Sequence, residues 1–308
     1  MPAPRKKKRT PPTPHQQHPP KPRPPPQRPP HTVAITRAPA FLRFNPYIRK
    51  GYRSTLDLTQ CLYSILWCHN ETVNIWTHVF GFGVFVCLFV YDAVVVFGQL
   101  RGTHHDALVV TFVLLSFMLC MLLSSLYHTF NCHSQETYTR WLTYDIFGIS
   151  TSFLAIFLSG LYYGFWCPET IGVRYIYVIL VCGLFVAAMI FLLTPRLLGS
   201  EWDLIRVGLF TGWAISGLLP TFHWVYLHGG LEANIVKVFL PRILVMYAIS
   251  LTAVVIYLLK IPERFYPGRF DIVGASHQLW HLVVLIALVY WHQTGIEYAN
   301  YRLMYGCM

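Results

Sequence analysis

The chain has 308 residues, and its 24 Lys and Arg against 13 Asp and Glu give a formal net charge of +11. Only 12% of its residues are charged, about half of the share in an average soluble domain, and its mean hydropathy is +0.45. These values exclude an ordinary soluble protein.

Charge and proline are concentrated near the N-terminus. Residues 1–70 carry 13 Lys/Arg and one acidic residue, a net charge of +12, whereas residues 71–308 carry 11 Lys/Arg and 12 acidic residues, a net charge of −1. We predict a disordered, basic, proline-rich tail over 1–40 and a cytosolic juxtamembrane segment over 41–73, followed by a transmembrane domain over 74–300 and a luminal tail over 301–308. The basic run at 5–9 is interpreted as solvated charge, so we expect no nucleic-acid partner.

Seven apolar runs follow the tail, each close to the roughly 20 residues that a helix needs to cross the hydrocarbon layer. They cover residues 74–97, 107–127, 141–163, 174–194, 204–226, 241–260 and 277–296. The sequence therefore predicts an all-α membrane protein, a bundle of seven transmembrane helices. The fifth run is interrupted by Arg206, by Pro220 and by three glycines, and such small residues usually let helices pack closely: Gly208, Gly212 and Gly217.

The basic N-terminal segment also predicts the orientation. Positive residues before the first span, including Arg43, Arg49 and Lys50, favour a cytosolic N-terminus. Seven spans then place the C-terminus on the luminal or extracellular side. Cys167 and Cys307 would both face that oxidising side, where a disulfide between them and two free thiols are equally open.

Polar residues at the cytosolic ends of three spans are predicted to meet. Span two ends near Ser124 and His128, span three begins near Asp145, and span seven begins with His277 and His281. Residues four apart share one helix face, so the Ser124 and His128 pair and the His277 and His281 pair each direct two polar groups to one side. Ionisable groups at membrane depth are costly, so each needs a partner or a function.

Three imidazoles that converge in apolar surroundings form a Zn²⁺ site with an open fourth position, which is the arrangement of catalytic zinc. His128, His277 and His281 are the candidate ligands. Asp145 would orient a ligand or a water molecule, or act as general base in the hydrolysis of an ester or amide. The alternative is that these histidines only form hydrogen bonds between helices or at the membrane interface.

Other ionisable residues are not predicted to join this site. His223 and His292 lie toward the opposite side of the membrane and are interpreted as packed or interfacial, and His104 and His105 as solvated. Asp92 lies about 27 Å along the first span at 1.5 Å per residue, so we interpret it as interfacial.

At these residues the chain resembles the progestin and adipoQ receptor family, seven-span proteins with a cytosolic N-terminus. The resemblance covers roughly residues 44–301 and rests on N-E-T-V-N-I-W at 70–76, S-x-x-x-H at 124–128, Asp145, P-E-R at 262–264 and S-H-Q-L-W-H at 276–281. In the adiponectin receptors of this family, the matching positions bind zinc through three histidines. The resemblance implies ligand roles for His128, His277 and His281, a water-positioning role for Asp145 and a place for Ser124 in the site wall.

Within the family, the chain looks most like a Golgi-membrane branch that captures Raf kinase through its cytosolic N-terminal region and damps MAP kinase signalling. This resemblance implies a membrane regulator with Raf kinase and membrane lipids as partners, a binding surface in residues 41–68, and a zinc site that mainly holds helices together. The adiponectin-receptor branch implies instead a ceramidase-like zinc hydrolase of a lipid amide, with Asp145 and Ser124 as catalytic residues. A third implication is a receptor for an adiponectin- or progestin-type ligand. The resemblance favours the first role.

Overall fold

The computed structural model describes residues 32–96, 103–194, 197 and 202–307. Most of the predicted tail, including the basic run at 5–9, lies outside these residues. Within them, seven helices or helix pairs are long and apolar enough to cross a membrane, and no strand is assigned, so the predicted all-α architecture is confirmed. The spanning elements are α2 (Thr72–Tyr91) with the π-helical turn η3 (Asp92–Val96), α4 (His104–Phe130), α5 (Gln135–Gly164), α6 (Ile171–Leu192), α7 (Asp203–Ser216) with α8 (Leu218–Leu227), α9 (Asn234–Leu259) and α10 (Ser276–Tyr305).

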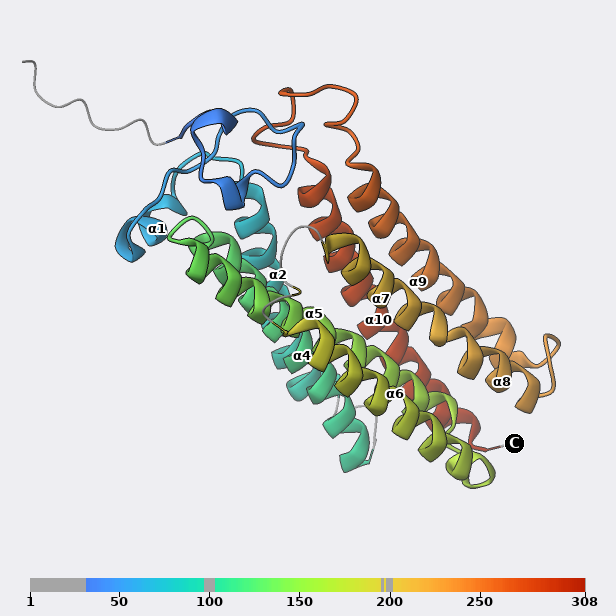
Figure 1. Cartoon of the computed structure of the whole chain (residues 1–308). Coiled ribbons are helices and arrows are strands. Elements are labelled where there is room, and N and C mark those ends of the chain that lie inside the picture. The colour runs from blue at the N-terminus through green and yellow to red at the C-terminus, as the bar shows by residue number, and fades with distance from the viewer. Residues whose placement is uncertain (1–31, 97–102, 195–196, 198–201, 308) are drawn as a thin grey trace, which may run out of the picture. The chain divides into compact units, whose positions relative to one another are not determined.

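The packed core lies between α2, α4, α5 and α10. α4 lies along both α2 and α5, and α9 lies along α10 (Figure 1). Rings and aliphatic side chains from all four core helices form one buried cluster that includes Phe85, Phe117, Ala155 and Leu285. The core therefore fixes the relative positions of the helices that carry the predicted metal ligands.

The fifth predicted span is broken in the middle. Gly217 ends α7 and precedes α8, and a Cβ there would lie only 2.7 Å from the Tyr247 hydroxyl, so the predicted close packing is confirmed at this glycine. The same prediction is wrong for Gly208 and Gly212, where an added Cβ would meet no described atom within 4 Å. Pro220 lies in the first turn of α8, where its missing N–H costs no helical hydrogen bond.

Both ends of the folded part differ from the predicted domain boundaries. Residues 33–40, assigned to the tail from their composition, pack against the rest: Val33 pairs with Tyr52 through a 2.7 Å backbone hydrogen bond, and Ala38 is buried. α10 continues to Tyr305, beyond the predicted start of a luminal tail at 301. Its last turns are too polar for a hydropathy signal, but they bury Tyr298 and Arg302 on one helix face.

Residues 33–70, here called the N-terminal cap, pack on the end of the bundle where α10 begins. The cap includes the short helix α1 (Leu58–Ser64) and the 3-10 turns η1 (Ile35–Arg37) and η2 (Ala40–Leu42). Glu263, which is fully buried, accepts a hydrogen bond from the side chain of Asn45 at 3.0 Å and from the backbone N–H of Ser276 at 2.8 Å. The cap is therefore bonded through one carboxylate to the first residue of α10.

The opposite end of the bundle, here called the disulfide end, is closed by covalent and ionic links. Cys167 and Cys307 form a disulfide, which resolves the choice that the sequence left open. Asp106, at the start of α4, and Arg302, near the end of α10, form a buried ion pair at 2.5 Å. This end joins the first turn of α4 to the last turns of α10.

Candidate metal centre

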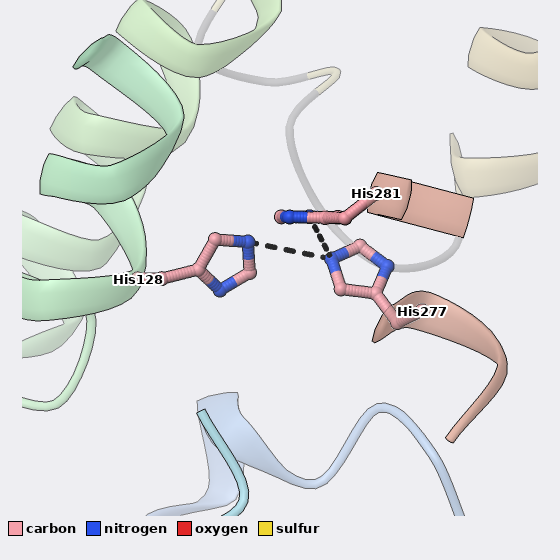
Figure 2. A group of neighbouring side chains, drawn as sticks. All are labelled: His128, His277 and His281. Carbon is pink, nitrogen blue, oxygen red and sulfur yellow. Dashed lines mark hydrogen bonds between the residues drawn. The ribbon is translucent and has the colours of Figure 1, made fainter. Parts of the chain in front are cut away.

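Three histidine rings from two helices converge at the end of the bundle beneath the N-terminal cap, here called the histidine end. His128 extends from the last turn of α4, and His277 and His281 extend from the first two turns of α10 (Figure 2). The Nε2 atom of His277 lies 3.4 Å from that of His128 and 3.2 Å from that of His281. The structure thus brings together the three predicted ligands, all within a region where His128 and His281 are no more than 1% exposed.

These nitrogens have the spacing of a tetrahedral zinc site. Two ligand nitrogens about 2.0–2.1 Å from one tetrahedral ion lie about 3.3 Å from each other, which matches both Nε2 separations. Three neutral imidazoles whose lone pairs meet at one point lack the donors to satisfy each other, whereas a cation satisfies them all. The donor set suits zinc because imidazole is one of its preferred ligands.

Asp145 and His277 border one elongated cavity of about 1020 Å³. The Asp145 carboxylate is buried next to Ser124, and its Oδ1 atom has no hydrogen-bond partner among the described residues. Ser124 is one turn before His128 on α4, as its spacing predicted. The cavity extends past these polar groups between α5, α7, α8, α9 and α10 as far as Trp224 and Tyr298, and apolar side chains line most of it.

An aromatic group surrounds His277 at the end of this cavity. The ring of Trp280 stacks on it with 5.4 Å between centroids, and the rings of Tyr257 and Phe44 lie at 5.9 and 6.3 Å. Phe44 belongs to the N-terminal cap, so the cap contributes directly to the wall beside the histidines. These rings limit the access of water to His277.

α2 and Glu71, the residue just before it, supply a polar layer behind the ligands that the sequence analysis did not identify. The carboxylate of Glu71 accepts a hydrogen bond from Nδ1 of His128 at 2.7 Å, and the same Oε2 atom accepts one from the side-chain amide of Asn74 at 2.6 Å. Glu71 thereby fixes the tautomer of His128 so that Nε2 faces the other two rings. Burial opposes charge on Glu71, but the neighbouring His128, Arg53 and Asn74 outweigh it and hold the pKa of Glu71 below its usual range.

His78 also belongs to this layer. Its ring stacks on that of His281 with centroids 3.9 Å apart, and neither of its nitrogens has a hydrogen-bond partner among the described residues. Residues 71, 74 and 78 are spaced by three and four, so they share one face of α2. The spacing of Glu71 and Asn74 within the N-E-T-V-N-I-W motif, with His78 four residues after Asn74, was the signal that could have placed them beside the site.

The buried guanidinium of Arg53 links the N-terminal cap to the end of α4. It donates to the backbone oxygens of His128 and Thr129, to Oδ1 of Asn131 and to the hydroxyl of Ser64. Since the last turn of a helix has carbonyls without intrahelical partners, Arg53 satisfies two of them directly around a predicted ligand. The backbone that carries His128 is therefore held by the cap.

The remaining intramembrane histidines lie away from the three ligands. His223 pairs with Tyr177 at 2.9 Å near the disulfide end, as expected for a packed histidine. His292 is buried and binds Asp92 at 2.7 Å. The interpretation of Asp92 as interfacial is therefore wrong: it is 1% exposed, because α10 supplies a buried partner at the position where α2 changes to a π-helical turn. His104 and His105 are exposed, as predicted.

The family model described as haemolysin-III related matches residues 66–292, which include all three histidines and Asp145. The chain belongs to the haemolysin-III related family. Mouse and human proteins named progestin and adipoQ receptor family member 3 are each 38% identical over 270 residues, covering 87% of this chain and 86% of the relative. The Drosophila melanogaster adiponectin receptor protein is 30% identical over 87% of this chain and 60% of its own length.

Plant relatives share the architecture of this haemolysin-III related protein. Heptahelical transmembrane protein 1 of Arabidopsis thaliana is 30% identical over 290 residues, covering 89% of this chain and 83% of the relative. The predicted resemblance to the progestin and adipoQ receptors is confirmed by these matches, and the chain is a multi-pass membrane protein of that family.

Proposed function

We propose that this protein is a zinc-dependent hydrolase of a lipid amide. The observation that carries the proposal is the position of Asp145 and His277 in the wall of one long, mostly apolar cavity. Nine residues of α10 line this cavity, from His277 to Tyr298. These two residues are 21 positions apart, which corresponds to about 31 Å of helix at 1.5 Å per residue. A cavity of this length suits a long acyl chain whose polar end lies beside the histidines.

His128, His277 and His281 would hold the ion in the proposed site. When bound, zinc would supply Lewis-acid chemistry toward a carbonyl group and a water molecule. The Oδ1 atom of Asp145, which has no hydrogen-bond partner among the described residues, would accept a proton from the attacking water and return it to the leaving amine. Ser124, next to the Asp145 carboxylate, would fix its orientation. The apolar lining would exclude bulk water and hold the acyl chain in position.

The test combines metal content with turnover of a long-chain ceramide by the purified full chain. We expect about one zinc per chain in the wild type, loss of zinc in His281→Ala, and loss of turnover with zinc retained in Asp145→Asn. The control is His223→Ala, which removes a half-buried histidine outside the site and should retain both zinc and turnover. Absence of zinc from the wild type would overturn the metal site, and zinc without turnover of any lipid amide would overturn the hydrolase.

We further propose that the histidine end faces the cytosol. The exposed basic residues of the N-terminal cap and of the connection between α9 and α10 support this orientation: Arg37, Arg49, Lys50, Arg264 and Arg269. Protease protection of an epitope placed on the cap, measured in sealed vesicles, tests it. Protection of the epitope inside Golgi vesicles would contradict this orientation.

A second candidate function is capture of Raf kinase at the Golgi membrane. This is the role that the resemblance to the Golgi-membrane branch implies. The 38% identity to progestin and adipoQ receptor family member 3, which extends over 87% of this chain, favours it. The folded N-terminal cap supplies an exposed basic surface for a partner at Arg49 and Lys50. Membrane capture of purified Raf kinase by the full chain tests it, with Arg49→Glu/Lys50→Glu compared with Arg140→Glu. Wild-type protein that captures no kinase would overturn this role.

A further inference from the structure

α1 has an apolar face that no described part of the chain covers. Its buried side, formed by Cys61 and Ser64, lies against the end of α4. On another side, Leu58 and Leu62 are 53% and 52% exposed, and Leu66, in the turn that follows the helix, is 79% exposed. Three large aliphatic side chains at intervals of four therefore face away from the protein.

This apolar face is continuous with the lipid-facing side of the first span. Trp76, in the first turns of α2, is 46% exposed, and its indole N–H donates to the backbone oxygen of Ile65 at 3.1 Å. One turn further along α2, Phe80 is 67% exposed, as expected for a side chain in contact with lipid. The exposed side chains of the connection after α1 therefore adjoin those of a membrane-spanning helix.

The position of α1 is that of a helix at the membrane boundary. Figure 1 shows α1 beside the bundle, next to the end of α4 and the start of α5, with the bundle end itself covered by other parts of the cap. A partly exposed Trp in the first turns of a spanning helix marks the level of the head groups. Gln60, on the remaining face of α1, is exposed and polar. The helix thus has one protein face, one apolar face and one polar face.

We propose that α1 is an interfacial helix whose Leu58, Leu62 and Leu66 insert into the boundary between head groups and acyl chains of the bilayer that α2 spans. The occupant of the apolar face is lipid, because the face adjoins the lipid-exposed surface of α2. The polar face of α1 remains in water.

This contact would connect the bilayer surface to the candidate metal centre. Arg53 donates to Ser64 in α1 at 2.7 Å and also to the backbone of His128. Cys61 of α1 lies 3.6 Å from Cys132, four residues after that histidine, measured between the sulfur atoms. Lipid contact also removes the leucine face from the surfaces available for kinase capture, and leaves the polar face of α1 and the basic part of the cap.

Nitroxide accessibility in nanodiscs of phosphatidylcholine tests the proposal. Single cysteines replace Leu62 or Leu66, and the controls replace Gln60 on the polar face of the same helix or Lys50 in the exposed basic part of the cap, with Phe80→Cys as the lipid-exposed reference. The background removes the free cysteines that are not buried and keeps the disulfide: Cys68→Ser, Cys87→Ser and Cys182→Ser. All these positions are exposed and should tolerate a label. Each labelled protein must therefore elute from a size-exclusion column as the wild type does.

The ratio of access by oxygen, which concentrates in lipid, to access by a water-soluble nickel chelate is the readout. We expect this ratio at Leu62→Cys and Leu66→Cys to be several-fold higher than at Gln60→Cys and Lys50→Cys, and close to the value at Phe80→Cys. Nickel access at Leu62→Cys equal to that at Gln60→Cys would overturn the proposal and leave the face free for a protein partner. Protection of both leucine positions from both reagents would also overturn it, because protein would then cover the face.

Discussion

Replacing Glu71 should weaken zinc binding although Glu71 is not a ligand. Its carboxylate lies 2.7 Å from Nδ1 of His128 and 2.6 Å from the Asn74 amide, and both hydrogen bonds are buried. Loss of such an outer carboxylate typically lowers metal affinity about 10–100-fold, which is about 1.4–2.7 kcal/mol. Glu71→Gln keeps an oxygen that can accept both hydrogen bonds and loses only the charge, whereas Glu71→Ala loses both hydrogen bonds and leaves a void.

The two variants should therefore differ in degree. We expect zinc affinity to fall by about 10-fold in Glu71→Gln and by about 100-fold or more in Glu71→Ala. Because Glu71→Ala removes a buried, charge-assisted hydrogen bond, this substitution should also destabilise the metal-free protein by about 1.5–3 kcal/mol. Competition with a fluorescent chelator measures the affinity, and thermal unfolding of the metal-free protein measures the second effect.

The control is Glu136→Gln, which makes the same change in an exposed carboxylate paired with Arg140 at the histidine end. It should leave both readouts at their wild-type values, because exposed ion pairs contribute little. Wild-type zinc affinity in Glu71→Ala would refute the reasoning, since the void and the missing hydrogen bond would then have no effect on His128.

Three further predictions concern stability. Arg302→Met should lower the free energy of unfolding by about 3–5 kcal/mol, because it leaves Asp106 buried without its partner. Cys307→Ser should cost about 2–5 kcal/mol, because the Cys167–Cys307 disulfide closes a long loop. Burial lowers the pKa of His69 from 6.5 to about 4, so its neutral form stabilises the fold fully above pH 6.5, and this contribution, on the order of 3 kcal/mol, is lost as pH falls toward 4. Unfolding followed by circular dichroism measures all three effects, with a smaller pH dependence expected in His69→Gln.

Each of these predictions has a control that makes the same chemical change at an exposed position. Arg242→Met removes a half-exposed pair with Glu297, Cys68→Ser removes an exposed thiol, and His105→Gln removes an exposed imidazole. All three controls should lie close to the wild type. An Arg302→Met protein as stable as Arg242→Met, or a His69→Gln protein with the wild-type pH dependence, would contradict the corresponding prediction.

The helices and the three histidines were predictable because their signals are local and periodic. Long apolar runs locate spans without any knowledge of neighbours, and alternating helix direction places His128 and His277 at the same depth. Charge balance in the tail was a poorer guide to domain boundaries. Residues 33–40 read as tail from their composition, yet Val33 pairs with Tyr52, a contact that depends on a segment outside that window.

The second layer of the site was not predicted because it depends on contacts between distant segments. Glu71 lies before the first span and is 57 residues from His128, so only packing of α2 against α4 brings them together. The burial of Asp92 was not predicted for a similar reason, since its partner His292 is 200 residues away. A rule based on depth alone assigns a carboxylate near the membrane surface to water unless the partner is known.

The many roles of α10 have a consequence for how the protein is made. α10 follows every other described span in the chain, yet it carries two of the three histidines, the partner of Asp106 and the residues that lead to Cys307. During synthesis, neither the metal site nor either link at the disulfide end can form until this helix has inserted. A ribosome-bound chain that lacks α10 would expose the incomplete cavity and unpaired buried charges to lipid, and would therefore be a substrate for membrane quality control. Metal loading would then report that insertion of all the spans is complete.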